Sequence, residues 1–190
     1  MRRVLLIGVM MALYTTVIAQ PKKLLGGDVS LLPSYEAQHT VYKDFNGRKV
    51  SFLPFVKQQG WNAIRVRLFV DPANAPGDHK DEGVCQDLAY VIKLSRQVKK
   101  AGMQLMLDFH YSDTWADPGK QFTPHAWQQA NKQALTDSVY AYTRRVLEVM
   151  KKVGVAPDLI QVGNEITNGL LWPTGKLEIE IGRASCRERV

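Results

Sequence analysis

The stretch LIQVGNE, residues 159–165, is an apolar run that ends abruptly in a glycine, an asparagine and a glutamate. A short buried strand that delivers a carboxylate at its C-terminal end is how parallel α/β proteins present acids to a ligand. Polar side chains at such a position are costly to bury unless something needs them. Glu165 is therefore the first candidate for chemistry, and Asn164 adds a neutral hydrogen-bonding group beside it.

Segments with strand-like and helix-like apolar spacing alternate along the chain. The pattern predicts strands at 24–30, 62–70, 103–110 and 159–164, separated by helices at 49–59, 88–101 and 125–153. Gly60 and Gly102 stop the first two helices, and Gly154 and Pro157 follow the third. Sequences that alternate in this way build parallel sheets through right-handed βαβ crossovers.

Two parallel folds fit four strand–helix units, a doubly wound sheet and a (β/α)8 TIM barrel. Gly26 and Gly27 in the first strand lack the glycine-rich fingerprint of a dinucleotide site, which favours the barrel. A barrel of this kind has eight units. The sequence thus predicts an α/β fold of the (β/α)8 TIM-barrel class, with only about the first four βα units present.

The two ends of the chain differ from its middle. Residues 1–19 combine Arg2 and Arg3 with an apolar run and end on Ala19, which predicts a cleaved secretory signal peptide and a secreted or periplasmic protein. An uncleaved N-terminal anchor is the alternative. Residues 181–190 (IGRASCRERV) have no strand or helix period and resemble a translated sequencing adapter, so we expect a non-native tail. The alternative is a solvated basic tail. Residues 20–180 are then the N-terminal half of the barrel.

The net charge becomes small once these ends are set aside. The chain carries +7, of which Arg2 and Arg3 contribute two positive charges and residues 181–190 a net two, leaving +3. A domain of this charge without a basic stripe is not built for nucleic acid, and none is expected as a partner. Cys186 lies in the tail, so Cys85 remains alone and no disulfide framework is expected.

All four predicted strands end in polar or charged side chains. They are Asp28 and Ser30, Arg65 and Arg67, Asp108 and His110, and Asn164 and Glu165. Each alone has a structural interpretation, such as a turn cap, an ion pair or a satisfied polar core group. Because barrel active sites gather at the C-terminal ends of the strands, their recurrence predicts one shared site.

The segment from the end of the third strand onward is DFHYSDTWADPGKQ, residues 108–121, and it interleaves aromatic rings with acids. Flat rings beside hydrogen-bonding carboxylates suit sugars, whose C–H faces stack on the rings while their hydroxyls need acceptors. Trp172 offers a second aromatic wall. A metal site from His110, Asp113 and Asp117 is the alternative, but it lacks an established ligand spacing, so neither a metal nor a cofactor is expected.

Four segments of the chain resemble those of a known enzyme family. They are DVS at 28–30, RVRL at 65–68, DFHYSDTWADPGKQ at 108–121 and QVGNEITNGLLWP at 161–173. Over about residues 24–175 the chain resembles the glycoside hydrolase family 53 arabinogalactan endo-β-1,4-galactanases. The resemblance implies a secreted, retaining (β/α)8 hydrolase that cleaves internal β-1,4 bonds in the (arabino)galactan side chains of pectin. It also implies a monomer at full length, with no membrane attachment after signal cleavage.

The same resemblance implies roles for individual residues. Glu165 would be the general acid/base, the proton donor, and Asn164 would hydrogen-bond the sugar 2-hydroxyl near the cleavage point. Further residues would support the site or line subsites, namely Asp28, Arg67, His110, Asp113, Trp115 and Trp172. The family's nucleophile is a second Glu after strand seven, a strand that this sequence does not contain. The 190-residue chain by itself is therefore expected to be inactive and poorly soluble.

Two other functions stay open at this point. One is a non-catalytic galactan-binding protein that keeps the aromatic subsites. The other is a related barrel β-glycanase acting on β-mannan or cellulose, which would share the Asn164 and Glu165 pair but does not explain the segment 108–121. A structural calcium site in the second half of such a barrel also stays open.

Overall fold

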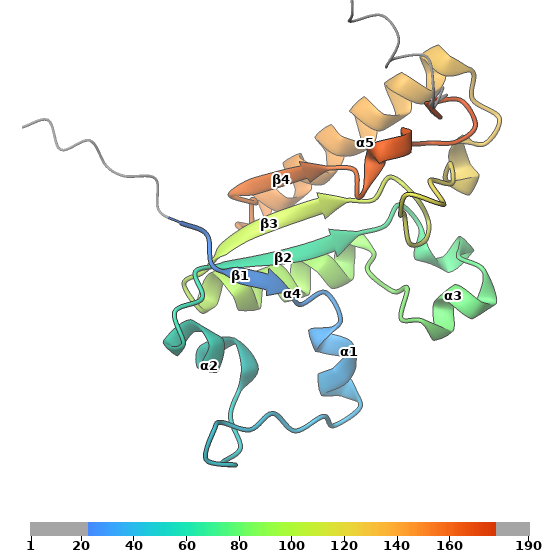
Figure 1. The fold of residues 1–190 in the computed structure, drawn as a ribbon. Coiled ribbons are helices and arrows are strands. Elements are labelled where there is room, and N and C mark those ends of the chain that lie inside the picture. Colours follow the sequence, from blue (N-terminus) through green and yellow to red (C-terminus); the bar gives the residue numbers. More distant parts are fainter. Residues whose placement is uncertain (1–22, 178–190) are drawn as a thin grey trace, which may run out of the picture.

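The computed structural model describes residues 23–177 of the chain (Figure 1). The predicted signal peptide at 1–19 and the predicted tail at 181–190 lie outside the described residues, and both stay predictions. Every helix within 23–177 is too short or too polar to span a membrane.

The centre of the structure is a four-stranded parallel sheet. Its strands are β1 (Gly26–Asp28), β2 (Ala63–Leu68), β3 (Gln104–Phe109) and β4 (Leu159–Val162). They lie side by side in chain order, β1-β2-β3-β4, and all point the same way (Figure 1). The four predicted strands are confirmed, and sequential parallel strands require a crossover between each pair.

Helices and short helical turns make up the connections. The helices are α1 (Leu32–Ala37), α2 (Phe52–Gln58), α3 (Gly77–Asp81), α4 (Leu88–Lys100) and α5 (Lys132–Lys152). The 3-10 turns are η1 (Pro72–Asn74), η2 (His125–Trp127) and η3 (Ile166–Asn168). The predicted helices at 49–59 and 88–101 correspond to α2 and α4. The segment between β2 and α4, for which the sequence predicts neither a strand nor a helix, contains η1 and α3.

The third predicted helix begins later than the expected position 125. The reason is a capping side chain, because Asn131 accepts a hydrogen bond of 2.9 Å from the backbone N–H of Ala134. An N-cap of this kind satisfies a backbone donor that has no partner inside the helix and so sets the start of the helix. His125–Trp127 form the separate turn η2 ahead of it.

The two faces of the sheet differ in polarity. Successive strand residues point to opposite faces. In β2, Ile64, Val66 and Leu68 are fully buried and join the apolar core cluster, which also contains Val91 and Leu94 of α4. Burying one such side chain stabilises the fold by about 1.5–3 kcal/mol. The core therefore holds the sheet against its helices and leaves the opposite face free for polar residues.

That opposite face carries charged side chains in register across the strands. Asp28 of β1 lies beside Arg65 of β2, Arg67 of β2 lies beside Asp108 of β3, and Asp108 lies beside Gln161 of β4. Because the strands are parallel, these positions gather toward one end of the sheet. The sheet thus delivers side chains from all four strands to one region.

Candidate active site

Glu165 lies just past β4 in a turn with a special backbone. Gly163, the first residue after the strand, has a φ of +82°, and a Cβ at this position would lie only 2.5 Å from Cγ2 of Ile166. Glu165 itself has φ 50° and ψ 44°, in the left-handed region. A non-glycine residue there costs on the order of 1–3 kcal/mol and persists only when its surroundings hold it. Within residues 23–177 the exposed carboxylate of Glu165 makes no hydrogen bond.

Arg65 connects the polar ends of all four strands. Its Nη1 donates to Oδ2 of Asp28 at 2.6 Å, and its Nη2 donates to Oδ1 of Asn164 at 2.7 Å. The Nη2 atom also pairs with the carboxylate of Asp108, and Nε donates to Oε1 of Gln161 at 3.1 Å. A planar guanidinium with five donors is suited to join several acceptors at once. Arg65 therefore fixes the side chain of Asn164 relative to the sheet.

Arg67 forms the second arginine contact to Asp28. Its Nη2 donates to Oδ1 of Asp28 at 2.9 Å, and its Nε donates to Oγ of Ser30 at 3.1 Å. The guanidinium carbon lies 4.2 Å from the ring centroid of Trp115, which is cation–π geometry. Burial raises the pKa of Asp28, but hydrogen bonds from Ser30 and the charges of Arg67 and Arg65 outweigh it, so the net pKa is lowered. Asp28 is thereby kept ionised.

His110 is buried and held by its own loop. Its Nδ1 accepts a hydrogen bond of 3.1 Å from the backbone N–H of Ala116, so the neutral ring carries its hydrogen on Nε2. Nε2 lies 3.1 Å from Oδ2 of Asp108, but the two are not aligned for a hydrogen bond. Among the described residues, Nε2 of His110 and Oδ1 of Asp108 are buried atoms without a hydrogen-bond partner. Asp108 is in β3, and His110 directly follows the strand.

Several of these side chains line one open hollow of about 470 Å³. Its lining comes from the ends of β2, β3 and β4 and the segments that follow them, and consists of Arg65, Arg67, Glu82, His110, Trp115, Ala116, Asp117, Lys120, Asn164 and Glu165. Five of the eight residues singled out from the sequence are in this list. The structure therefore brings the predicted acid, its asparagine neighbour, an arginine, a histidine and a tryptophan to one place.

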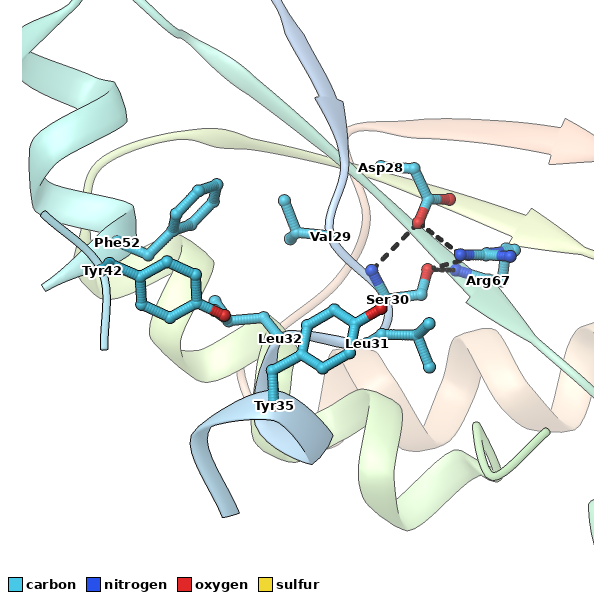
Figure 2. Close-up of a pocket in the computed structure, with 9 residues that line it drawn as sticks. All are labelled: Asp28, Val29, Ser30, Leu31, Leu32, Tyr35, Tyr42, Phe52 and Arg67. Atoms are coloured by element: carbon cyan, nitrogen blue, oxygen red, sulfur yellow. Dashed lines mark hydrogen bonds and ion pairs between the residues drawn. The ribbon is translucent and has the colours of Figure 1, made fainter. Parts of the chain in front are cut away.

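Asp28 lies beside this hollow and lines a neighbouring one. Figure 2 shows Asp28, Ser30 and Arg67 joined by hydrogen bonds on one side of the second hollow, opposite the rings of Tyr42 and Phe52. This second hollow measures about 300 Å³. Arg67 lines both hollows and so marks the border between them.

Asp113 and Trp172 lie outside the main hollow. The carboxylate of Asp113 accepts backbone hydrogen bonds from Asp71 at 3.0 Å and from His125 at 2.8 Å, so it ties two loops together. Burial raises the pKa of Asp113, although these two hydrogen bonds act in the opposite direction. Trp172 lines a separate hollow of about 310 Å³ together with Trp127. Their predicted contacts with substrate stay predictions.

Comparison with known proteins decides the family. The model of glycosyl hydrolase family 53 matches residues 24–185. The chain belongs to this family. The probable arabinogalactan endo-β-1,4-galactanase A of Neosartorya fischeri is 40% identical over 151 residues, covering 80% of this chain and 40% of the relative. The arabinogalactan endo-β-1,4-galactanase A of Aspergillus niger is 38% identical over 151 residues, covering 80% of this chain and 41% of the relative.

Solved structures agree with this assignment. The family 53 catalytic domain of Ignisphaera aggregans matches with a TM-score of 0.72 and 36% identity, over 80% of this chain and 42% of that domain. A structure of fungal β-1,4-galactanases matches with a TM-score of 0.71 and 34% identity, over 81% of this chain and 43% of that one. The chain spans about 40% of the length of the curated relatives it matches. The predicted fold is confirmed: the sheet forms the first four βα units of a (β/α)8 barrel.

Two residues of the site were not predicted to be important from the sequence. Arg65 has no assigned role there beyond its place at a strand end, but in the structure it contacts residues from the other three strand units. Gln121 is the last residue of the segment 108–121 and is 2% exposed. Its side-chain amide contacts the backbone oxygens of Asn164 and Glu165. The strand register would have suggested Arg65, because it lies beside Asp28. No local pattern marks Gln121, since its partners at the turn, Asn164 and Glu165, are more than forty residues away.

Within residues 23–177, no group of three or more His, Cys, Asp or Glu side chains is arranged to hold a metal ion. The alternative site from His110, Asp113 and Asp117 is not such a group. The carboxylate of Asp113 accepts hydrogen bonds from backbone amides, and the carboxylate of Asp117 caps a turn in its own loop. The Oδ1 atom of Asp117 accepts from the backbone N–H of Gly119 at 2.7 Å.

Proposed function

We propose that this chain carries the acid/base half of the active site of a secreted or periplasmic, retaining endo-β-1,4-galactanase that acts on internal bonds of (arabino)galactan. The observation that supports this most directly is the position of Glu165 and Asn164 at the C-terminal end of β4, in one hollow with His110 and Trp115. Barrel active sites lie at this end of the strands. The names of the family 53 relatives supply the substrate class.

Glu165 acts as the proton donor in this proposal. A retaining glycosidase uses two carboxyl groups about 5–5.5 Å apart, one to protonate the leaving oxygen and one to attack the anomeric carbon. Glu165 gives its proton to the glycosidic oxygen as the bond to the leaving sugar breaks. It then takes a proton from water, which displaces the second carboxylate from the covalent intermediate. The family resemblance places that second carboxylate after strand seven, outside the four described strands.

Asn164 is held ready to bind the sugar. Its Oδ1 accepts from Arg65 at 2.7 Å, and its Nδ2 donates to the backbone oxygen of Ala116 at 2.7 Å. A side-chain amide has two hydrogens on its nitrogen. One of the two has no partner among residues 23–177 and is available for the sugar 2-hydroxyl. A hydrogen bond to that hydroxyl strengthens in the transition state.

The decisive experiment replaces Glu165 by Gln in the whole gene product that contains this chain. Removing a general acid/base costs about 10²–10⁴-fold in rate, so hydrolysis of β-1,4-galactan should fall by that amount. New reducing ends released from galactan measure the rate. The matched control is Glu148→Gln on α5, whose side chain is 69% exposed and forms only an i,i+4 pair with Arg144. The control should keep the original rate.

Other outcomes contradict the proposal in different ways. Normal galactan hydrolysis by Glu165→Gln would remove Glu165 from the mechanism. Binding of galactan oligosaccharides without any new reducing ends in the original protein would show a binding protein instead. Faster release of reducing ends from β-mannan or cellulose than from galactan would assign the site to another β-glycan.

A further inference from the structure

Gln121 is buried between the two loops that form the site. It lies in the segment that joins β3 to η2, and only 2% of it is exposed. Its side-chain nitrogen lies within hydrogen-bond distance of the backbone oxygens of Asn164 at 2.8 Å, Asp117 at 3.1 Å and Glu165 at 3.3 Å. The amide has two hydrogens for these three acceptors, so one of the hydrogens is shared. Its own backbone oxygen accepts from the N–H of Trp172 at 2.7 Å. One residue thus bonds to the chain before and after the turn at Glu165.

The two turn carbonyls that Gln121 contacts have a particular position. The oxygen of Asn164 belongs to the peptide plane before the Cα of Glu165, and the oxygen of Glu165 belongs to the plane after it. Peptide units are planar, so a hydrogen bond to each of these oxygens restrains φ and ψ of the residue between them. These two angles set the direction of its Cα–Cβ bond. The amide of Gln121 therefore restrains the direction in which the side chain of Glu165 leaves the backbone.

The backbone of Glu165 needs such a restraint. Its φ of 50° and ψ of 44° are in the left-handed region, which costs on the order of 1–3 kcal/mol for a residue other than glycine. Within the described part of the chain, no hydrogen bond holds its carboxylate directly. The direction of the side chain thus depends on the backbone, and the backbone is held by Gln121.

We propose that Gln121 is a positioning residue for the proton donor, acting through the two peptide planes that flank Glu165. This inference rests on the proposed function, because it takes Glu165 to be the acid/base. Gln121 is buried and does not line the hollow at Glu165, so it acts through its neighbours and not by contact with a substrate. A misplacement of about 1 Å in a catalytic group can cost on the order of 10²-fold in rate, so loss of this restraint should be visible in proton transfer.

The loops have other contacts that stay in place when the Gln121 amide is removed. Asn164 Nδ2 donates to the oxygen of Ala116 at 2.7 Å, and Asn168 Nδ2 donates to the oxygen of Pro118 at 2.8 Å. Thr123 Oγ1 donates to the oxygen of Trp172 at 2.9 Å. Variants at 121 should therefore keep the two loops docked while the turn at Glu165 loses its restraint.

The test uses Gln121→Met, which keeps the length of the side chain and removes its donor, in the whole gene product. Two substrates are compared by kcat/KM, which reports the first chemical step. One is β-1,4-galactan, whose leaving sugar needs a proton. The other is a dinitrophenyl galactoside of matched length, whose leaving group departs without one. We expect a loss of about 10–100-fold on galactan and less than about threefold on the dinitrophenyl substrate.

Two further variants complete the design. Gln121→Asn keeps the donor but withdraws it by one methylene, and it should show the same split between substrates if Gln121→Met fails to fold. Gln129→Met changes an exposed glutamine near η2 and should leave both substrates unaffected. Equal losses on both substrates, or no loss on galactan, would overturn the inference. If Glu165→Gln is inactive on galactan while the Gln121 variants are normal, the positioning role fails and the proposed function stands.

Discussion

At the scale of residues, the site is organised by two arginines and two aspartates. Asp108 has a fully buried side chain and pairs with Arg65, while Asp28 pairs with both Arg65 and Arg67. A charge that leaves water is tolerated only where it is paired and hydrogen-bonded. The two positive and two negative charges of this cluster cancel. Asn164, which is neutral, is connected to the cluster by its hydrogen bond from Arg65.

The ionisation of Asp28 makes a contribution to stability that depends on pH. Its folded-state pKa is lowered because the Ser30 hydrogen bonds and the charges of Arg67 and Arg65 outweigh the opposing effect of burial. A lowered pKa stabilises the folded protein above the unfolded-state pKa of about 3.9, and this contribution is lost as the pH falls through the folded value. The free energy of unfolding should therefore decline between about pH 5 and pH 3.

Urea unfolding of the whole gene product at a series of pH values tests this. The variant Asp28→Asn should be less stable at pH 7 and should show a shallower decline between about pH 5 and pH 3. The control Asp81→Asn, at the exposed end of α3, should follow the original curve. A decline as steep in Asp28→Asn as in the original protein would show that Asp28 does not carry the effect.

At the scale of elements, the shortest strand depends on a glycine. β1 has only three residues, and Gly26 pairs with Ala63 of β2. A Cβ on Gly26 would lie 1.7 Å from the backbone oxygen of Ala63. Backbone cannot move aside as a flexible side chain can, so any larger residue must push the strands apart. The position of Asp28, two residues later, depends on this close approach.

The variant Gly26→Ala should therefore destabilise the protein. Overpacking of this kind costs about 1–3 kcal/mol, which urea unfolding can measure as a lower free energy of unfolding. The matched control is Gly77→Ala at the start of α3, where an added Cβ meets nothing within 4 Å. The explanation fails if Gly26→Ala unfolds at the same urea concentration as the original protein. It also fails if Gly77→Ala loses as much free energy of unfolding as Gly26→Ala does.

At the scale of the whole molecule, the described sheet is open. Among residues 23–177, β1 and β4 each pair with one strand only. β4 also exposes apolar side chains, because Ile160 is 45% and Val162 is 61% exposed. Unpaired strand edges and exposed apolar side chains are sites where chains associate. The four βα units on their own therefore present a surface that favours association.

The 190-residue chain expressed on its own should self-associate and release no reducing ends from galactan. Analytical ultracentrifugation measures the first property and a reducing-end assay the second. Val162→Lys should raise the monomer fraction, because a charged edge residue opposes strand pairing. Val41→Lys, at a position 51% exposed in the loop between α1 and α2, should not. A monomeric original chain, or galactan hydrolysis by it, would contradict this expectation.

Much of the fold was predictable because the relevant signals are local. The β-branched run at 62–70 and the spacing of Val91, Leu94 and Val98 specify a strand and a helix whatever surrounds them. Boundaries that depend on one side chain were less predictable, as with Asn131, which starts α5 at Lys132. Short elements such as α3 were missed because a single turn has too few residues to show a period.

The sequence by itself determined the alternation of strands and helices, the family, and the candidates Glu165 and Asn164, because periodicity and motif can be read along the chain. Only the tertiary structure decided that Arg65 joins residues up to 99 positions away, and that Gln121 holds the two peptide planes around Glu165. It also decided that Asp113 and Trp172 lie apart from the main hollow. The physical reason is that these contacts join segments far apart in the chain, and their distances are set by how the strands pack and not by neighbouring residues.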